Sequence, residues 1–130
     1  MKLELIENNV VLKLAIDFSL SMIKYCEKFE EDRKYIVAKQ LLRSSTSIGA
    51  NAFEAQNHES TADFIHKFKI AAKEVNETQY WLLLCKKSES YPDCDDLLLK
   101  LESIDKVISK IISTAKRKKP ISYSLSLFLF

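Results

Sequence analysis

The chain has 130 residues, a mass of 15.0 kDa and a formal net charge of +2, enough material for one domain with a single core. One glycine and two prolines are too few turn-forming residues for a fold rich in β-strands. No apolar run is long enough to cross a membrane as a helix, and the start, MKLELIENN, lacks the apolar block of a signal peptide. These features predict an all-α, cytoplasmic protein that does not interact with membranes.

The first half of the chain predicts two long helices. Apolar residues recur at spacings of three and four over about residues 8–30, which is the period of one helical face, and Asn8 can cap the start. The charged stretch EEDRK is expected to form a turn, with Asp32 as the N-cap of a second helix over residues 33–56.

The second half predicts two more helices. A third helix is expected over residues 60–89, since Ser60 followed by Asp63 resembles a capping box. It should end before Tyr91-Pro92, and Asp93 can cap a fourth helix over residues 93–116. Short connections make long helices antiparallel neighbours, so residues 1–119 predict an up-down-up-down four-helix bundle, followed by an apolar tail over 120–130.

The sequence gives little indication of a catalytic site or a metal site. The three cysteines, Cys26, Cys85 and Cys94, form no CxxC pair and predict buried free thiols. A di-iron bundle needs two Glu-x-x-His motifs, but the chain has only two histidines, and Glu54 and His58 are four residues apart. Therefore we expect no enzyme activity, no metal, no cofactor and no small-molecule substrate.

Carboxylates on the third helix do not change that expectation. Glu74 and Glu77 could act as an acid and a base, but no nucleophile or histidine accompanies them. They predict helix surface charges instead.

The stretch LLRSSTSIGANAFEA, from Leu41 to Ala55, has unusually many small side chains for a bundle helix, and we call it the thin stretch. It holds Gly49, the only glycine, and glycine inside a helix costs about 1 kcal/mol relative to alanine, which indicates a packing reason. Small side chains let helices approach closely, either within one bundle or between subunits. Large apolar residues that lie outside the apolar faces of the predicted helices favour association between copies of the chain. The interface candidates are Gly49, Phe53, Tyr80 and Trp81, with Leu83 beside them.

Polar residues predict a seam between the second and third helices. Arg43 and Glu54 are eleven residues apart, so they share one helical face about 16 Å apart. Our hypothesis is that Arg43 pairs with Glu74 or Glu77, and that Asn51 hydrogen-bonds across the same seam. Losing one partner of a buried pair would cost about 3–5 kcal/mol. The alternative is a solvated surface face.

Four basic residues stand at and just after the end of the fourth helix, and without them residues 1–115 carry 16 basic and 18 acidic residues. A helix C-terminus favours positive charge in any case, so the cluster alone is a weak signal. It nevertheless suggests an alternative function, binding of RNA or DNA through phosphates. The residues concerned are Lys116, Arg117, Lys118 and Lys119.

The thin stretch and STADFIHKFKIAAKEVNETQYWL, from Ser60 to Leu82, together resemble the 23S rRNA intervening-sequence proteins, a four-helix-bundle family. Members look like LLR(S/A)xxSIxxNIxEA in the second helix and FxxFxxIAxxSxxExxYxL in the third. The resemblance covers about residues 5–115, departs at Ala52-Phe53, where Ile-Ala is common, and does not extend to the tail. The matching residues are Arg43, Ser47, Ile48, Asn51, Glu54 and Ala55, then Phe64, Ile70, Ala71, Glu74, Glu77 and Trp81.

The resemblance implies a homopentamer without established enzymatic activity. A related bundle is the accessory variability determinant of diversity-generating retroelements, a pentamer that engages a reverse transcriptase and nucleic acid. The resemblance therefore implies copies of the chain itself as partners, together with a protein or a nucleic acid. Five basic clusters would place about 20 positive charges on one rim.

The tail ISYSLSLFLF, residues 121–130, alternates apolar residues with serines, which is the period of a strand with one apolar face. Two interpretations stay open. The tail is either a frayed terminus or an extended segment whose apolar side chains occupy a groove of its own or an adjacent subunit.

Overall fold

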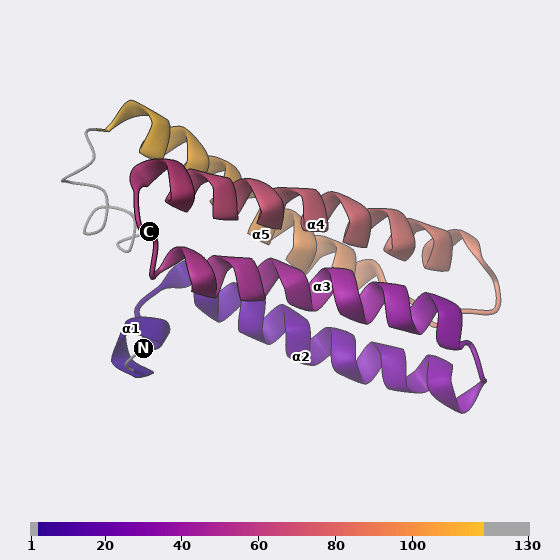
Figure 1. The fold of residues 1–130 in the computed structure, drawn as a ribbon. Helices are drawn as coiled ribbons and strands as arrows, with labels where there is room; N and C mark the ends of the chain where they lie inside the picture. The colour runs from indigo at the N-terminus through magenta and orange to yellow at the C-terminus, as the bar shows by residue number, and fades with distance from the viewer. Residues whose placement is uncertain (1–2, 119–130) are drawn as a thin grey trace.

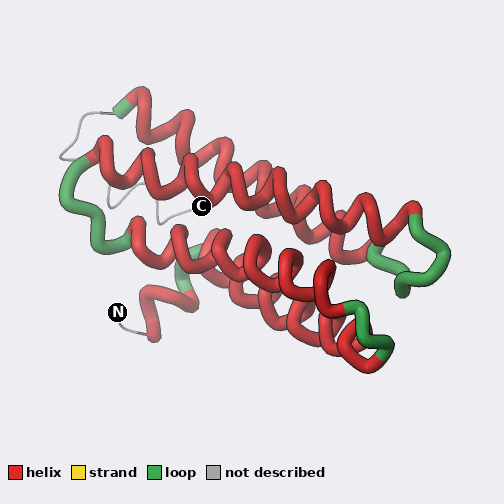
Figure 2. Tube along the Cα trace, turned by 45° about the vertical axis from the view of Figure 1, so that its right-hand side comes forward, coloured by secondary structure: helices red, strands yellow, loops and turns green. Residues whose placement is uncertain are grey.

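The computed structural model describes residues 3–118, and within them every regular element is a helix. Four long helices run antiparallel to their chain neighbours, and short loops join them at the two ends of the bundle (Figures 1 and 2). The all-α, up-down-up-down four-helix bundle is therefore confirmed. The helices are α1 (Leu3–Glu7), α2 (Val10–Glu31), α3 (Tyr35–Ala55), α4 (Thr61–Lys87) and α5 (Asp95–Arg117).

Each long helix packs against the next one along the chain, and α5 closes the bundle against α2. The core between them is rich in aromatic side chains, with Phe18, Phe29, Phe64 and Phe68 almost fully buried. Burying one such side chain contributes about 1.5–3 kcal/mol. Hydrophobic burial at helical spacing is thus the main term that holds the four helices together.

The start of the first long helix differs from the prediction. Asn9, not Asn8, is the N-cap, because its side chain accepts a hydrogen bond from the Leu12 amide at 3.3 Å. The residues before it form the separate short helix α1, which the sequence pattern did not predict. The half-buried Ile6 anchors α1 against the bundle core.

The turn after α2 also differs from the prediction. Asp32 is the C-cap of α2 and not the N-cap of α3. Arg33 follows with a φ of 60°, the left-handed conformation that commonly ends a helix. The chain then starts α3 at Tyr35, with no side-chain cap from Lys34.

The predicted cap of α4 is confirmed. Ser60 accepts a hydrogen bond from the Asp63 amide at 3.0 Å, and the Asp63 carboxylate accepts from the Glu59 amide at 3.1 Å. The predicted cap of α5 is wrong, since the N-cap is Cys94 and not Asp93. The Cys94 side chain instead points inward, and Sγ contacts the Leu82 carbonyl oxygen at 3.3 Å.

Contacts with α2 and the α2–α3 turn hold the connection between α4 and α5. The Tyr25 hydroxyl donates a 2.7 Å hydrogen bond to the Pro92 carbonyl, and the Tyr91 ring packs edge-on against Phe29 at 4.8 Å. Lys34 Nζ lies 4.5 Å from the centre of the Tyr91 ring and donates to the Ser90 carbonyl. These contacts fix the end of the bundle that is remote from α1.

No helix among residues 3–118 is both long and apolar enough to cross a membrane. The predicted apolar tail over 120–130, like Lys119, lies outside the described residues.

Candidate interaction surfaces

The predicted pairing of Arg43 with carboxylates on the next long helix is confirmed. Arg43 Nη1 lies 3.3 Å from Glu74 Oε2, and Arg43 Nη2 donates to Glu77 Oε2. The indole Nε1 of Trp81 donates to the same Glu77 oxygen at 3.1 Å. One carboxylate of α4 thus joins an arginine of α3 to a tryptophan of α4.

This polar group is a surface feature, since the Arg43 side chain is 47% exposed. The hydrogen bond from Arg43, aided by that from Trp81, lowers the pKa of the Glu77 carboxyl. The same hydrogen bond raises the pKa of Arg43. A half-exposed ion pair contributes about 1 kcal/mol at most, so the 3–5 kcal/mol expected for a buried pair is an overestimate.

Two other residues of the predicted seam behave differently. Asn51 does not hydrogen-bond across the seam, because its Nδ2 donates to the Ser47 carbonyl of its own helix at 2.8 Å. Glu54 does reach α4, where its carboxylate lies 4.0 Å from Lys67 Nζ. The expectation for Asn51 was wrong because an amide side chain in a helix can bond the carbonyl four residues earlier.

The buried polar contact between α3 and α4 is one that sequence reasoning missed. The Thr78 hydroxyl donates to Ser44 Oγ at 2.9 Å, and both side chains are fully buried. The one feature of the sequence that could have indicated this contact is that Ser44 and Thr78 each lie on a helix face whose other residues are apolar or small.

Large apolar side chains gather on the outer side of α3 and α4. Tyr80 is 57% exposed, and its ring lies 5.4 Å from the Trp81 ring. Ile36, at 80% exposed, is seven residues before Arg43, and the exposed Leu84 is seven residues after Glu77. Because seven residues are two helical turns and the helices are antiparallel, the Arg43–Glu77 pair places Ile36 beside Leu84. We call Ile36, Tyr80, Trp81 and Leu84 the tyrosine–tryptophan face.

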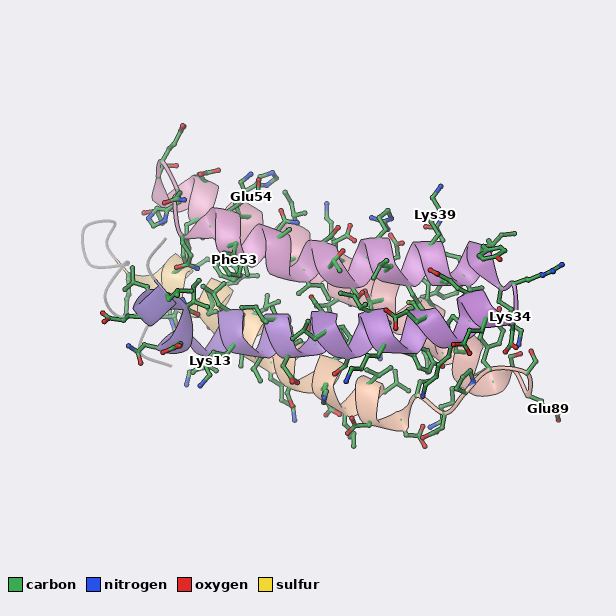
Figure 3. The ribbon with its side chains drawn as sticks, turned by 90° about the horizontal axis from the view of Figure 1, so that it is seen from below. Lys13, Lys34, Lys39, Phe53, Glu54 and Glu89 are labelled. Carbon is green, nitrogen blue, oxygen red and sulfur yellow. The ribbon has the colours of Figure 1, made fainter. Side chains whose placement is uncertain are left out.

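A second apolar surface lies between α2 and α3. This α2–α3 groove has a volume of about 220 Å³. Phe53 lies where α3 faces α2, while the neighbouring Glu54 points away (Figure 3). The groove is lined by Ala15, Ile16, Ser19, Leu20, Thr46, Gly49, Ala50 and Phe53.

The glycine has a packing reason within the chain. Gly49 is buried, and a Cβ built on it would lie 3.3 Å from Ala15 Cβ of α2. Gly49 therefore lets α2 and α3 approach closely, which is the intramolecular alternative considered for the thin stretch. A role for Gly49 between subunits stays a prediction, as it does for Phe53.

A third depression, the α4–α5 groove, has a volume of about 410 Å³ and a charged rim. Its rim carries Asp95, Glu102 and Asp105 as well as Lys86, whose Nζ pairs with Asp95 at 2.9 Å. Leu83 and the exposed Leu99 contribute apolar surface.

Basic residues dominate the C-terminal half of α5. Residues 106–118 contain five basic and no acidic residues, whereas 95–105 contain four acidic residues and one lysine. Of the predicted nucleic-acid residues, Lys116 and Arg117 are exposed in the last turn of α5, Lys118 is half-buried, and Lys119 is outside the described residues.

The three cysteines are free and buried, as predicted. Burial raises the pKa of the Cys26 thiol to about 12 and that of Cys85 to about 11, and it also raises the pKa of Cys94. Among residues 3–118, no three His, Cys, Asp or Glu side chains are grouped so that they could hold a metal ion.

Comparisons with known proteins agree with this fold and these motifs. The family model of the 23S rRNA-intervening sequence protein matches residues 7–110. A crystal structure of a protein with unknown function from the S23 ribosomal protein family of Bacteroides thetaiotaomicron VPI-5482 is 36% identical, with a TM-score of 0.75. That similarity covers 78% of this chain and 97% of the Bacteroides chain. No curated protein matches the chain. The chain belongs to the 23S rRNA-intervening sequence protein family.

Proposed function

We propose that the protein is a non-enzymatic, cytoplasmic bundle that self-associates and acts as a scaffold or interaction module. The observation that carries the proposal is the tyrosine–tryptophan face. Tyrosine, tryptophan and arginine are the residues most enriched at the energetic centres of protein interfaces. Here Tyr80 and Trp81 lie beside Arg43, and Ile36 and Leu84 widen the apolar area.

Association would use side chains that the fold has already ordered. The bonds from Trp81 and Arg43 to Glu77 fix the orientation of the indole and the guanidinium on the outside of the bundle. Side chains held in this way lose less conformational entropy when a partner covers them. The resemblance to the family gives five as the expected number of subunits, so the particle should have a mass of about 75 kDa.

Light scattering coupled to size-exclusion chromatography at micromolar concentration tests the proposal. We expect a particle several times heavier than the 15.0 kDa chain. The double substitution Ile36→Lys with Tyr80→Lys should yield monomers with an unchanged helical circular dichroism spectrum. Leu99→Lys is the matched control, because Leu99 is 64% exposed on α5, away from the face. A wild-type protein that runs as a monomer contradicts the proposal.

Binding of RNA or DNA is the second candidate function. It is favoured by one observation, the run of five basic and no acidic residues over 106–118. Association would multiply this charge, and neutralising several phosphates gives affinity that falls steeply with salt.

Retention on mixed RNA and DNA at low and moderate salt tests this candidate. Replacing Lys116, Arg117, Lys118 and Lys119 by glutamine should abolish retention. Replacing Lys24, Lys28, Lys39 and Lys87, which lie on other helices, should leave retention nearly unchanged. Absence of retention at low salt rejects the candidate.

A further inference from the structure

We propose that the apolar segment 121–130 crosses α2 and docks its last six residues in the α2–α3 groove of its own chain. The groove and the segment match in chemistry, and the end of α5 places one within reach of the other.

The groove presents an apolar surface without charge. None of the eight residues that line it is charged. On α2, Ile16, Leu20 and Ile23 follow one another at four and three residues, and Leu20 is 59% exposed. On α3, Gly49 and Ala50 keep the surface low between the larger Thr46 and Phe53. The result is a shallow channel with aliphatic and aromatic walls.

The segment ISYSLSLFLF suits such a channel. It carries no charged side chain, and its apolar residues alternate with serines up to Ser126. An extended chain can therefore turn apolar side chains toward the groove and serine hydroxyls toward water. The α4–α5 groove is a poorer match, because an uncharged segment there would remove water from Asp95, Glu102 and Asp105 without pairing them.

The path from the end of α5 to the groove is short enough for residues 119–130 to span. α5 ends at the end of the bundle where α2 begins, and the two helices are in contact (Figures 1 and 2). Ile16 lies six residues into α2, about 9 Å along its axis, and crossing one packed helix adds about 10 Å. Residues 119–130 can extend about 40 Å. The last six residues can thus reach the groove while the preceding ones cross α2.

Photo-crosslinking in the full chain tests the placement. A benzophenone amino acid at Leu127, on the same face of an extended chain as Leu125 and Leu129, should crosslink to peptides from residues 15–23 of α2 or 46–53 of α3. Mixing ¹⁵N-labelled and unlabelled protein before irradiation distinguishes docking within one chain from docking on another copy of the chain. Docking within one chain gives only pairs that are both labelled or both unlabelled. Mixed pairs, crosslinks elsewhere or no defined crosslink overturn the proposal.

A variant pair tests the groove itself. Leu20→Glu should reduce the crosslink yield at least about tenfold, since it places a charge in the apolar channel. Leu99→Glu introduces the same charge at an equally exposed leucine of α5 and should leave the yield unchanged. Equal yields from the two variants contradict the assignment.

Truncation after Lys119 gives a readout that does not depend on crosslinking. In methyl NMR spectra, the signals of Ile16 and Ile23 should shift on truncation, whereas Ile36, which is 80% exposed on the other side of α3, should not. Unchanged Ile16 and Ile23 signals in a folded truncated protein overturn the proposal. Particle mass is measured separately, so failure of self-association does not alter this result.

Discussion

Thr78 of α4 donates a 2.9 Å hydrogen bond to Ser44 of α3, and the two hydroxyls form a fully buried polar contact inside the bundle. The Ser44 hydroxyl lies in turn 3.4 Å from the Leu41 carbonyl of its own helix, so both groups have partners. A satisfied buried contact of this kind favours one register of the two helices, because a shift along the axis would take the Ser44 acceptor away from the buried Thr78 hydroxyl.

Removing one hydroxyl should reveal this coupling. Ser44→Ala leaves the Thr78 hydroxyl without its acceptor and should lower the free energy of unfolding by about 1–3 kcal/mol. The double variant with Thr78→Val should cost less than the sum of the two single variants, with a coupling energy of about 1 kcal/mol. Urea unfolding measures all three. Ser109→Ala, at an exposed serine of α5, is the control, and strictly additive energies contradict the interpretation.

The sequence predicted the long helices well because their apolar periodicity and the core they form are the same property. Ser60 and Asp63 gave a correct start for α4, since both of the hydrogen bonds involved are local. Asp32 and Asp93 were wrong caps because α3 and α5 start after Lys34 and Cys94, whose side chains make no capping hydrogen bond, so neither start carries a capping signal in the sequence. The short helix α1 was missed because five residues give too little periodicity.

The polar surface was predicted only in part, for a similar reason. The only carboxylate on the helix of Arg43 is that of Glu54, eleven residues away, so an ion pair has to use the neighbouring helix, where Glu74 and Glu77 stand at the matching spacing. Asn51 could bond either its own helix or the neighbour, and the local carbonyl of Ser47 is the partner. The exposure of the Arg43 pair depends on how closely α3 and α4 pack, which spacing along the sequence does not determine.

The contact of Gly49 with α2 leads to a prediction about helix packing. Gly49→Val should lower the free energy of unfolding by about 1–3 kcal/mol, because its side chain would push against Ala15 where even a Cβ would lie at 3.3 Å. Ala50→Val, at the exposed neighbouring position, should cost only about 0.5 kcal/mol of helix propensity. Thermal unfolding monitored by circular dichroism compares the two. Equal losses would mean that the α2–α3 contact does not limit side-chain size.

Glu77 leads to a prediction about pH. Because its hydrogen bonds lower its pKa in the folded state below the ordinary value of 4.5, the folded state favours the ionised carboxylate. The resulting stabilisation is present above pH 4.5 and is lost as the pH falls through the folded-state pKa. Wild type should therefore exceed Glu77→Gln in stability at neutral pH, and the difference should shrink in acid.

Urea unfolding at several pH values measures that difference. Glu102→Gln is the control, because it removes an ion pair to Lys106 within a single helix. Added salt should also reduce the effect of Glu77→Gln, since the Arg43 pair is exposed to solvent. A difference that stays constant from neutral pH to acid would contradict a role for the ionised Glu77.

The buried thiols lead to a prediction about chemical reactivity. The thiolate is the reactive form, and burial raises the pKa of Cys26, Cys85 and Cys94. An aromatic disulfide reagent at pH 8 should therefore titrate none of the three thiols in the native protein and all three in urea. The exposed variant Leu99→Cys should add one thiol that reacts at once.

Cys85 and Cys94 flank the α4–α5 connection that Tyr25 and Tyr91 hold in place. If either thiol reacts rapidly without denaturant, that connection opens in the native protein and the contacts with Pro92 and Phe29 do not keep it closed.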